Sequence, residues 1–415
     1  MKMLVRAAIL PLIVSISVTA IGLGVAACGD NGAVGGVEVI GQTPPVEADP
    51  DPEADPDPEA DPDPEADPDP EADPDPEAGS GTASALSGTK TAASGPYAPV
   101  GDVTSHAALA LDARDIAALL APAKDGQPVD WAAVRALYEN GKNSLKADGS
   151  ARTLQSIALA GDVLAQFPNG PAVYDDASFL DAHVRAGIDG TGRGAGISND
   201  ARRQLVEKGI SAILYGKVLQ ELDAAREKIQ TGETADPDGA PHNVDEAWAF
   251  YAGASDDSGA RPFALSSTAQ KREADFGLEG NIDTPLQQAL ADAQSAAQSG
   301  DLAAFDSAAV QVKGYLNTVF YLASLKYVKS AAGDTEKAAR ETHLAEGWAF
   351  FQTIRAAVAA GAGGADSAIE NVYSADAEVT VGSEQIDAVD AALNGGPVLD
   401  SLGVPEQLRV LDSQP

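Results

Sequence analysis

The chain has 415 residues, only 5% aromatic residues and a formal net charge of −36. Abundant Ala with few aromatic residues favours close-packed helices over a β-sandwich. So acidic a chain is a poor partner for DNA, RNA and anionic lipid surfaces, whereas cations suit it. Its single cysteine excludes an intramolecular disulfide and any zinc site built from several cysteines.

Residues 1–27 have the pattern of a bacterial export signal. Lys2 and Arg6 precede an uncharged apolar run, which ends in Val25-Ala26-Ala27-Cys28. This ending resembles a bacterial lipobox, in which the cysteine thiol accepts a diacylglyceryl group. A plain transmembrane anchor is the alternative, because about 20 apolar residues span a bilayer. We predict a lipoprotein signal peptide and lipidation of Cys28. The protein would then be membrane-anchored at a periplasmic or cell-surface site, on the outer membrane if the cell is Gram-negative.

Residues 28–97 are predicted to form a disordered acidic tether. Five copies of Ala-Asp-Pro-Asp-Pro-Glu run from Ala48 to Glu77. Alternating prolines block helix and sheet, and like charges extend the chain. We expect a spacer that lifts the following domain off the membrane, with weak buffering of cations as the alternative.

Residues 98–415 are predicted to form an all-α domain, because helical periodicity dominates from Ser105 onward. The Gly-rich segment Gly190–Gly196 follows no predicted strand, so we interpret it as a flexible loop rather than a phosphate-binding one. The predicted helices are 105–121, 130–146, 199–229, 243–254, 283–298, 301–332, 334–360 and 383–394.

An internal repeat is the most informative feature of this domain. Asn243–Tyr251 matches His343–Phe351 at an offset of 100 residues. We therefore predict a helical bundle of two pseudo-symmetric repeats, about 105–255 and about 283–372, with an insertion around 147–198 in the first. Two further matched pairs are Ile213–Tyr215 with Val319–Tyr321, and Asp130–Val134 with Asp301–Phe305.

Glu246 and Glu346 occupy matched positions on helices that are apolar nearly all round, which indicates burial. A buried carboxylate needs a cation or strong hydrogen-bond donors, because its desolvation is costly. One candidate partner is an Arg or Lys side chain. The residues considered for that role are Lys271, Arg272 and Arg340.

The other candidate partner is a metal ion. His242 precedes Glu246 by four residues and His343 precedes Glu346 by three, so each histidine shares a helix face with its glutamate. Carboxylate and imidazole, with the Tyr251 hydroxyl as a further candidate, suit iron or manganese, and zinc less distinctively. We predict that the four residues converge on one metal centre, with structural ion pairs as the alternative. The two other histidines, expected to be surface or capping residues, are His106 and His183.

Three segments resemble the algal iron-assimilating (low-iron-inducible periplasmic) protein family, namely His242–Gly253, Lys271–Gly277 and Ala345–Phe351. The resemblance covers most of 100–375 and implies a secreted protein linked to iron uptake. The segment His343–Glu346 is also similar to the His-x-x-Glu motif of imelysin-like periplasmic lipoproteins, although Glu341 stands where that family has glycine.

The sequence contains no His-Glu-x-x-His, no Gly-x-Ser-x-Gly and no P-loop, so we expect no enzyme. The preferred function is an exported lipoprotein that binds or delivers iron. A non-catalytic surface binding or scaffold module, whose repeat is purely structural and whose protein partners are unknown, is the second hypothesis. A metal-dependent enzyme with a carboxylate-bridged centre is the third.

Overall fold

A computed structural model describes residues 97–254, 261, 263–374, 376–378 and 380–409. The predicted signal peptide, the lipidation site Cys28 and the acidic repeats of the tether lie outside these residues. The described part is built from helices and contains no β-strand, which confirms the all-α prediction. Two residues of one loop, Leu145 and Ala151, form an isolated β-bridge. Within the same part, no helix combines the length and apolarity needed to cross a membrane.

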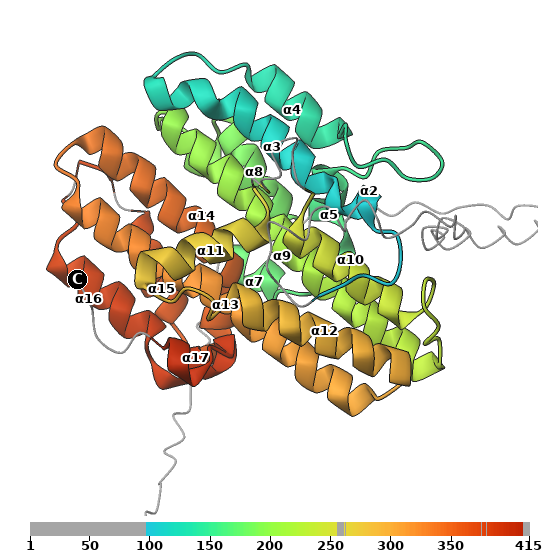
Figure 1. The fold of residues 1–415 in the computed structure, drawn as a ribbon. Coiled ribbons are helices and arrows are strands. Elements are labelled where there is room, and N and C mark those ends of the chain that lie inside the picture. The colour runs from blue at the N-terminus through green and yellow to red at the C-terminus, as the bar shows by residue number, and fades with distance from the viewer. Residues whose placement is uncertain (1–96, 255–260, 262, 375, 379, 410–415) are drawn as a thin grey trace, which may run out of the picture. The chain divides into compact units, whose positions relative to one another are not determined.

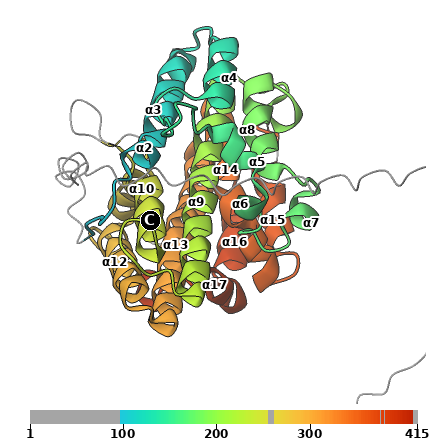
Figure 2. The ribbon, with the colours of Figure 1, turned by 90° about the vertical axis from the view of Figure 1, so that its right-hand side faces the viewer.

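Four helices form the centre of the domain (Figures 1 and 2). They are α9 (Asn199–Thr231), α10 (Ala240–Ala252), α13 (Leu302–Gly333) and α14 (Lys337–Gly361). α9 packs against α10 and α14, and α13 packs against α14. A fifth helix, α12 (Asp283–Ser299), packs against α13 and α10. Because the central helices have neighbours on several sides, their buried residues cover nearly all faces.

Shorter helices surround this centre. α8 packs on α9, α15 and α17 pack on α14, and α11 contacts both α13 and α10. Their bounds are α2 Thr104–Ala107, α3 Leu109–Leu120, α4 Trp131–Asn140, α5 Leu154–Leu159, α6 Gly161–Leu164, α7 Gly170–Tyr174, α8 Phe179–Asp189, α11 Leu265–Phe276, α15 Ala365–Tyr373, α16 Ser383–Leu393 and α17 Gly396–Leu402. Short 3-10 turns lie at Ala121–Asp125, Gly192–Gly194 and Glu406–Leu408.

The predicted long helices have clear start and stop signals. Ser198 caps α9 by accepting a hydrogen bond from the Ala201 amide, and Gly232 ends it with a φ of 83°. The helix predicted as 130–146 instead ends at Asn140, because Gly141 adopts a φ of 61° that breaks the helical path. Half of the insertion 147–198 is also helical, in the short helices α5 to α8 that we did not predict.

Matched capping residues begin two helices of the proposed repeats. The carboxylates of Asp130 and Asp301 each accept a hydrogen bond from the backbone amide three residues later, at 3.0 Å. The pairs α9–α10 and α13–α14 are both antiparallel hairpins of neighbouring helices. The wider pseudo-symmetry of the two halves stays a prediction.

A glycine allows close packing between α14 and α15. A Cβ atom added at Gly347 would lie 2.2 Å from Cε1 of the buried Tyr373 ring. The ring reaches across to α13, where its hydroxyl donates to the Ser324 carbonyl. The packing of α14 against α15 therefore depends on the absence of a side chain at position 347.

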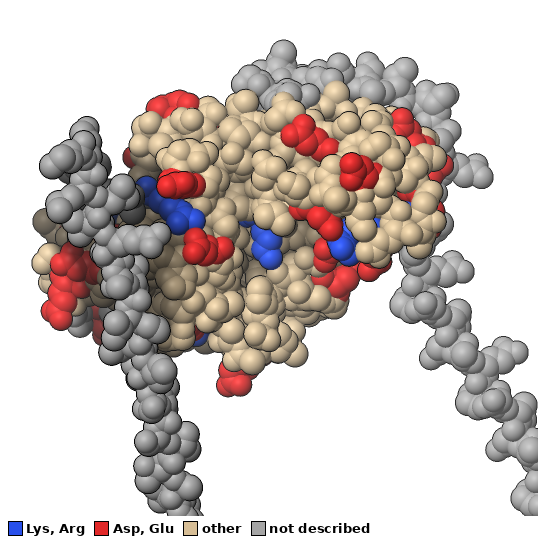
Figure 3. Space-filling view, turned by 90° about the horizontal axis from the view of Figure 1, so that it is seen from below, with Lys and Arg blue, Asp and Glu red and all other residues tan. Residues whose placement is uncertain are grey.

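The surface retains the acidity of the sequence. On the face shown in Figure 3, Asp and Glu side chains are spread among uncharged residues, and Lys and Arg side chains are fewer.

Candidate metal centre

Glu246 contacts two histidine rings in the interior of the first half. His242 lies one turn earlier on α10, whereas His106 comes from the short helix α2. The Glu246 Oε1 atom is 3.1 Å from His106 Nε2 and 3.2 Å from His242 Nε2. The three side chains are 12%, 7% and 6% exposed, respectively. The expectation that His106 is a surface or capping residue was wrong, because α2 packs this ring against α10.

A second carboxylate lies beside this group. Glu221 of α9 accepts a hydrogen bond from Asn243 Nδ2 at 2.9 Å and an ion pair from Lys217 Nζ at 2.6 Å. Burial, followed by the neighbouring Glu221, raises the pKa of Glu246 to about 7. Although burial opposes it, Lys217 holds the pKa of Glu221 below its ordinary value. The pair therefore holds one proton near neutral pH, and that proton resides mainly on Glu246.

The imidazole of His106 stays neutral. Burial lowers its pKa well below the ordinary value, and Arg152 and His242 act in the same direction. The Arg152 Nη2 atom lies 2.6 Å from His106 Nε2. An Nε2 atom that accepts a hydrogen bond from a guanidinium carries no proton to donate to Glu246. His106 Nε2 and an ionised Glu246 carboxylate would therefore meet as two acceptors, an approach that protonation of the carboxyl or a nearby cation makes less costly.

Basic side chains lie around this group. After burial, the charges of Arg152, Lys217 and Lys146 also lower the pKa of His106. Lys217 is paired with Glu221, and Glu246 meets the imidazoles of His106 and His242. A buried carboxylate without a counter-charge is costly, so it takes up a proton or binds a cation.

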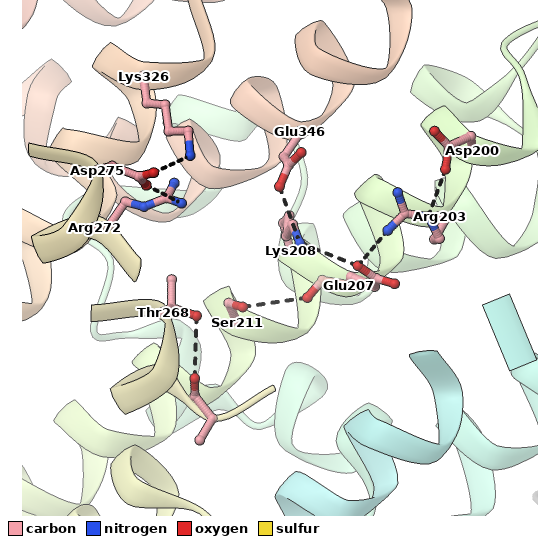
Figure 4. Close-up of polar contacts among 11 residues, drawn as sticks. Asp200, Arg203, Glu207, Lys208, Ser211, Thr268, Arg272, Asp275, Lys326 and Glu346 are labelled. Carbon is pink, nitrogen blue, oxygen red and sulfur yellow. Dashed lines mark hydrogen bonds and ion pairs between the residues drawn. The ribbon is translucent and has the colours of Figure 1, made fainter. Parts of the chain in front are cut away.

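Glu346 has a different environment (Figure 4). Lys208 of α9 places its Nζ atom 3.3 Å from Glu346 Oε1 and 3.3 Å from Glu207 Oε2. Arg203 completes the network by donating to Glu207 at 2.9 Å. In this half the ion-pair alternative describes the structure. Its cation comes from α9, however, and not from the three basic residues that the sequence suggested.

The remaining predicted partners have other contacts. His343 Nδ1 lies 2.7 Å from the Asp334 carboxylate, and the ring is 34% exposed. Arg272 pairs with Asp275 at 2.8 Å, as Figure 4 shows. Arg340 donates hydrogen bonds to the Ala377 and Asp334 carbonyls. The Tyr251 hydroxyl donates to the Asp283 carboxylate. The half-buried His183 ring packs against the rings of Trp348 and Tyr174. His183 is thus not the surface residue that we expected, and burial lowers its pKa to about 4.

The four predicted metal ligands fall into separate sets of contacts. Glu246 meets His242, whereas Glu346 meets Lys208 and His343 meets Asp334. Within the described residues, no group of three or more His, Cys, Asp and Glu side chains is arranged to hold a metal ion outright. One centre shared by both halves is therefore not formed by these contacts.

In each half, one lysine of α9 nevertheless lies over a phenylalanine ring at a matched position. Lys217 Nζ lies 5.5 Å from the centre of the Phe250 ring, and Lys208 Nζ lies 5.6 Å from that of Phe350. The two phenylalanines are matched positions of the repeat. The halves differ in what meets the glutamate, which is a lysine in the second half and two imidazoles in the first.

A comparison with protein families finds that residues 77–346 match the low iron-inducible periplasmic proteins, which is more than half of the chain. The chain belongs to this family. The match confirms the resemblance noted from the three segments, and it covers Glu246, its two histidines and Glu346. The family's description is that of a periplasmic, iron-related protein. Comparisons with curated proteins and with solved structures found no match. The similarity to imelysin-like lipoproteins stays a prediction.

Proposed function

We propose that this protein is an exported lipoprotein that binds iron, or delivers it, through Glu246, His242 and His106. The observation that carries the proposal is that one buried carboxylate oxygen lies 3.1 and 3.2 Å from two imidazole Nε2 atoms. Membership of an iron-related periplasmic family supports the choice of metal.

These separations suit ligands of a first-row transition metal. With metal–ligand bonds of about 2.1 Å and angles of about 90–110°, neighbouring ligand atoms lie about 3.0–3.4 Å apart. Both Glu246 contacts fall in this range. A set of one carboxylate and two imidazoles is typical of iron, manganese or zinc. Solvent or a further side chain would complete the coordination shell.

The charge of the group also favours a cation. Glu246 lies beside a second carboxyl, Glu221, which pairs with Lys217, and both histidines are buried. A divalent ion would replace the shared proton and neutralise Glu246. Because protons compete with the metal for carboxylate and imidazole alike, we expect binding to weaken as the pH falls below about 6.

We place this site in the first half only. Glu346 and His343, which the sequence also proposed as ligands, already have Lys208 and Asp334 as partners. Metal binding there would require both pairs to break.

The bound metal tests the proposal directly. The purified full chain should retain iron, measured by mass spectrometry of the acid-digested protein. Glu246→Gln should lose most of it, whereas Glu346→Gln, the matched control from the other half, should retain it. Equal iron in all three proteins would contradict the assignment to Glu246.

A second function remains open because the described residues hold no ready group of three metal ligands. The protein would then be a non-catalytic binding or scaffold module at the cell surface. An iron-free wild-type protein that also shows no increase in melting temperature on addition of Fe²⁺ or Mn²⁺ would favour this alternative.

A further inference from the structure

Arg152 is held against the candidate metal site by a loop of the first half. The loop joins α4 to α5, and the Leu145–Ala151 bridge closes it. The Arg152 amide donates to the Ser144 carbonyl at 2.8 Å, and its Nη1 atom donates to Ser144 Oγ at 3.2 Å. Ser144 is fully buried, and its hydroxyl donates to the Ser105 carbonyl beside His106 at 2.7 Å. The loop thus fixes the guanidinium next to α2.

The guanidinium meets the histidine atom that would bind the metal. Arg152 Nη2 and Glu246 Oε1 lie 2.6 Å and 3.1 Å from the same atom, His106 Nε2. A neutral imidazole nitrogen has one lone pair, which can accept one N–H group or bind one metal ion. The guanidinium keeps its charge at any accessible pH, so deprotonation does not release the contact.

We propose that Arg152 occupies the cation position of the site in the metal-free protein and that the incoming metal displaces it from His106. The inference rests on the proposed function and concerns its regulation. Arg152 then limits the affinity for the metal, because binding must break its contact and place two positive charges close together.

A basic side chain meets the candidate ligand residues in both halves, namely Arg152 at His106 and Lys208 at Glu346. In the second half, Lys208 meets Glu346 directly and fills the place of a cation. In the first half, Lys217 is paired with Glu221, and the arginine that meets His106 lies in the loop between α4 and α5. Because Arg152 lies outside α10, breaking its contact with His106 does not require α10, which carries His242 and Glu246, to move.

Calorimetric titration of the metal-stripped full chain with Mn²⁺ tests this inference. Arg152→Gln should bind Mn²⁺ at least about tenfold more tightly than wild type, because a positive charge and a competing donor are removed. Arg152→Lys keeps the charge and should bind within about threefold of wild type. Arg185→Gln is the matched control. It removes an arginine that pairs with Glu139 and Asp189 elsewhere in the same half, and it should leave the affinity unchanged.

The outcomes separate the inference from the proposed function. If wild type binds Mn²⁺ and Arg152→Gln binds it equally or more weakly, Arg152 does not compete with the metal and the inference fails alone. If neither protein binds Mn²⁺, the proposed site fails and the inference fails with it. Should Arg152→Gln not fold, Arg152→Met removes the same charge and donors, and the same gain in affinity is required of it.

Discussion

Replacing Glu246 by glutamine should stabilise the metal-free protein at high pH. The carboxyl titrates at about 7 in the folded chain, compared with an ordinary value of 4.5. Folding therefore favours the protonated form, and stability is lost as the pH rises from about 4.5 to 7. The difference corresponds to about 3 kcal/mol at pH 8, as an upper limit because Glu221 shares the proton. Glutamine resembles the protonated acid, so Glu246→Gln should recover most of that free energy.

Urea unfolding in the presence of a chelator measures this effect. At pH 8, Glu246→Gln should be up to about 3 kcal/mol more stable than wild type, and at pH 4.5 the two should differ by less than about 1 kcal/mol. The matched variant Glu346→Gln should behave in the opposite way. It removes the partner of Lys208 and should lose about 1–3 kcal/mol at pH 8. Equal destabilisation of both variants at pH 8 would refute the reasoning, because Glu246 would then be compensated as Glu346 is.

Three other predictions concern packing, the N-terminal segment and export. Gly347→Ala should lose about 2–4 kcal/mol of unfolding free energy because its Cβ meets the Tyr373 ring, whereas Gly363→Ala, which meets nothing within 4 Å, should change stability by less than about 1 kcal/mol. Asp245→Asn should speed amide exchange in residues 97–101, since this buried carboxylate accepts hydrogen bonds from two amides there. If the amides of residues 97–101 stay as protected from exchange in that variant as in wild type, the proposed role of Asp245 is wrong. Cys28→Ser should leave an unprocessed precursor in membrane fractions, and normal processing would exclude lipidation.

The sequence predicted the long helices well, because their signals are local. Apolar periodicity and caps such as Ser198 and Asp301 fix α9 and α13 to within a few residues. The short helices of the insertion were missed because segments of four to eleven residues are too short to show a clear period, and the Gly and Pro that begin α6 and α7 usually indicate loops. α5, α6 and α8 are stabilised by packing on α9, and α7 by packing on α14 and α8, which no local pattern shows.

The site was predicted in part. The spacing of His242 and Glu246 on one helix face was enough to bring them together. His106 was missed because it stands far away in the sequence on a four-residue helix. Lys208 and Lys217 gave a usable signal, since Lys208 follows Glu207 directly and Lys217 precedes Glu221 by four residues on one face of α9. Which lysine meets which glutamate depends on the packing of α9 between α10 and α14.

The most direct test of the central claim is a crystal structure of the iron-loaded full chain with anomalous data at the iron absorption edge. We expect one peak about 2.0–2.3 Å from Glu246 Oε1 and from the Nε2 atoms of His106 and His242, with Arg152 withdrawn from His106. A peak elsewhere in the domain, or iron-loaded protein in which Arg152 still contacts His106 and no peak lies near Glu246, would contradict it.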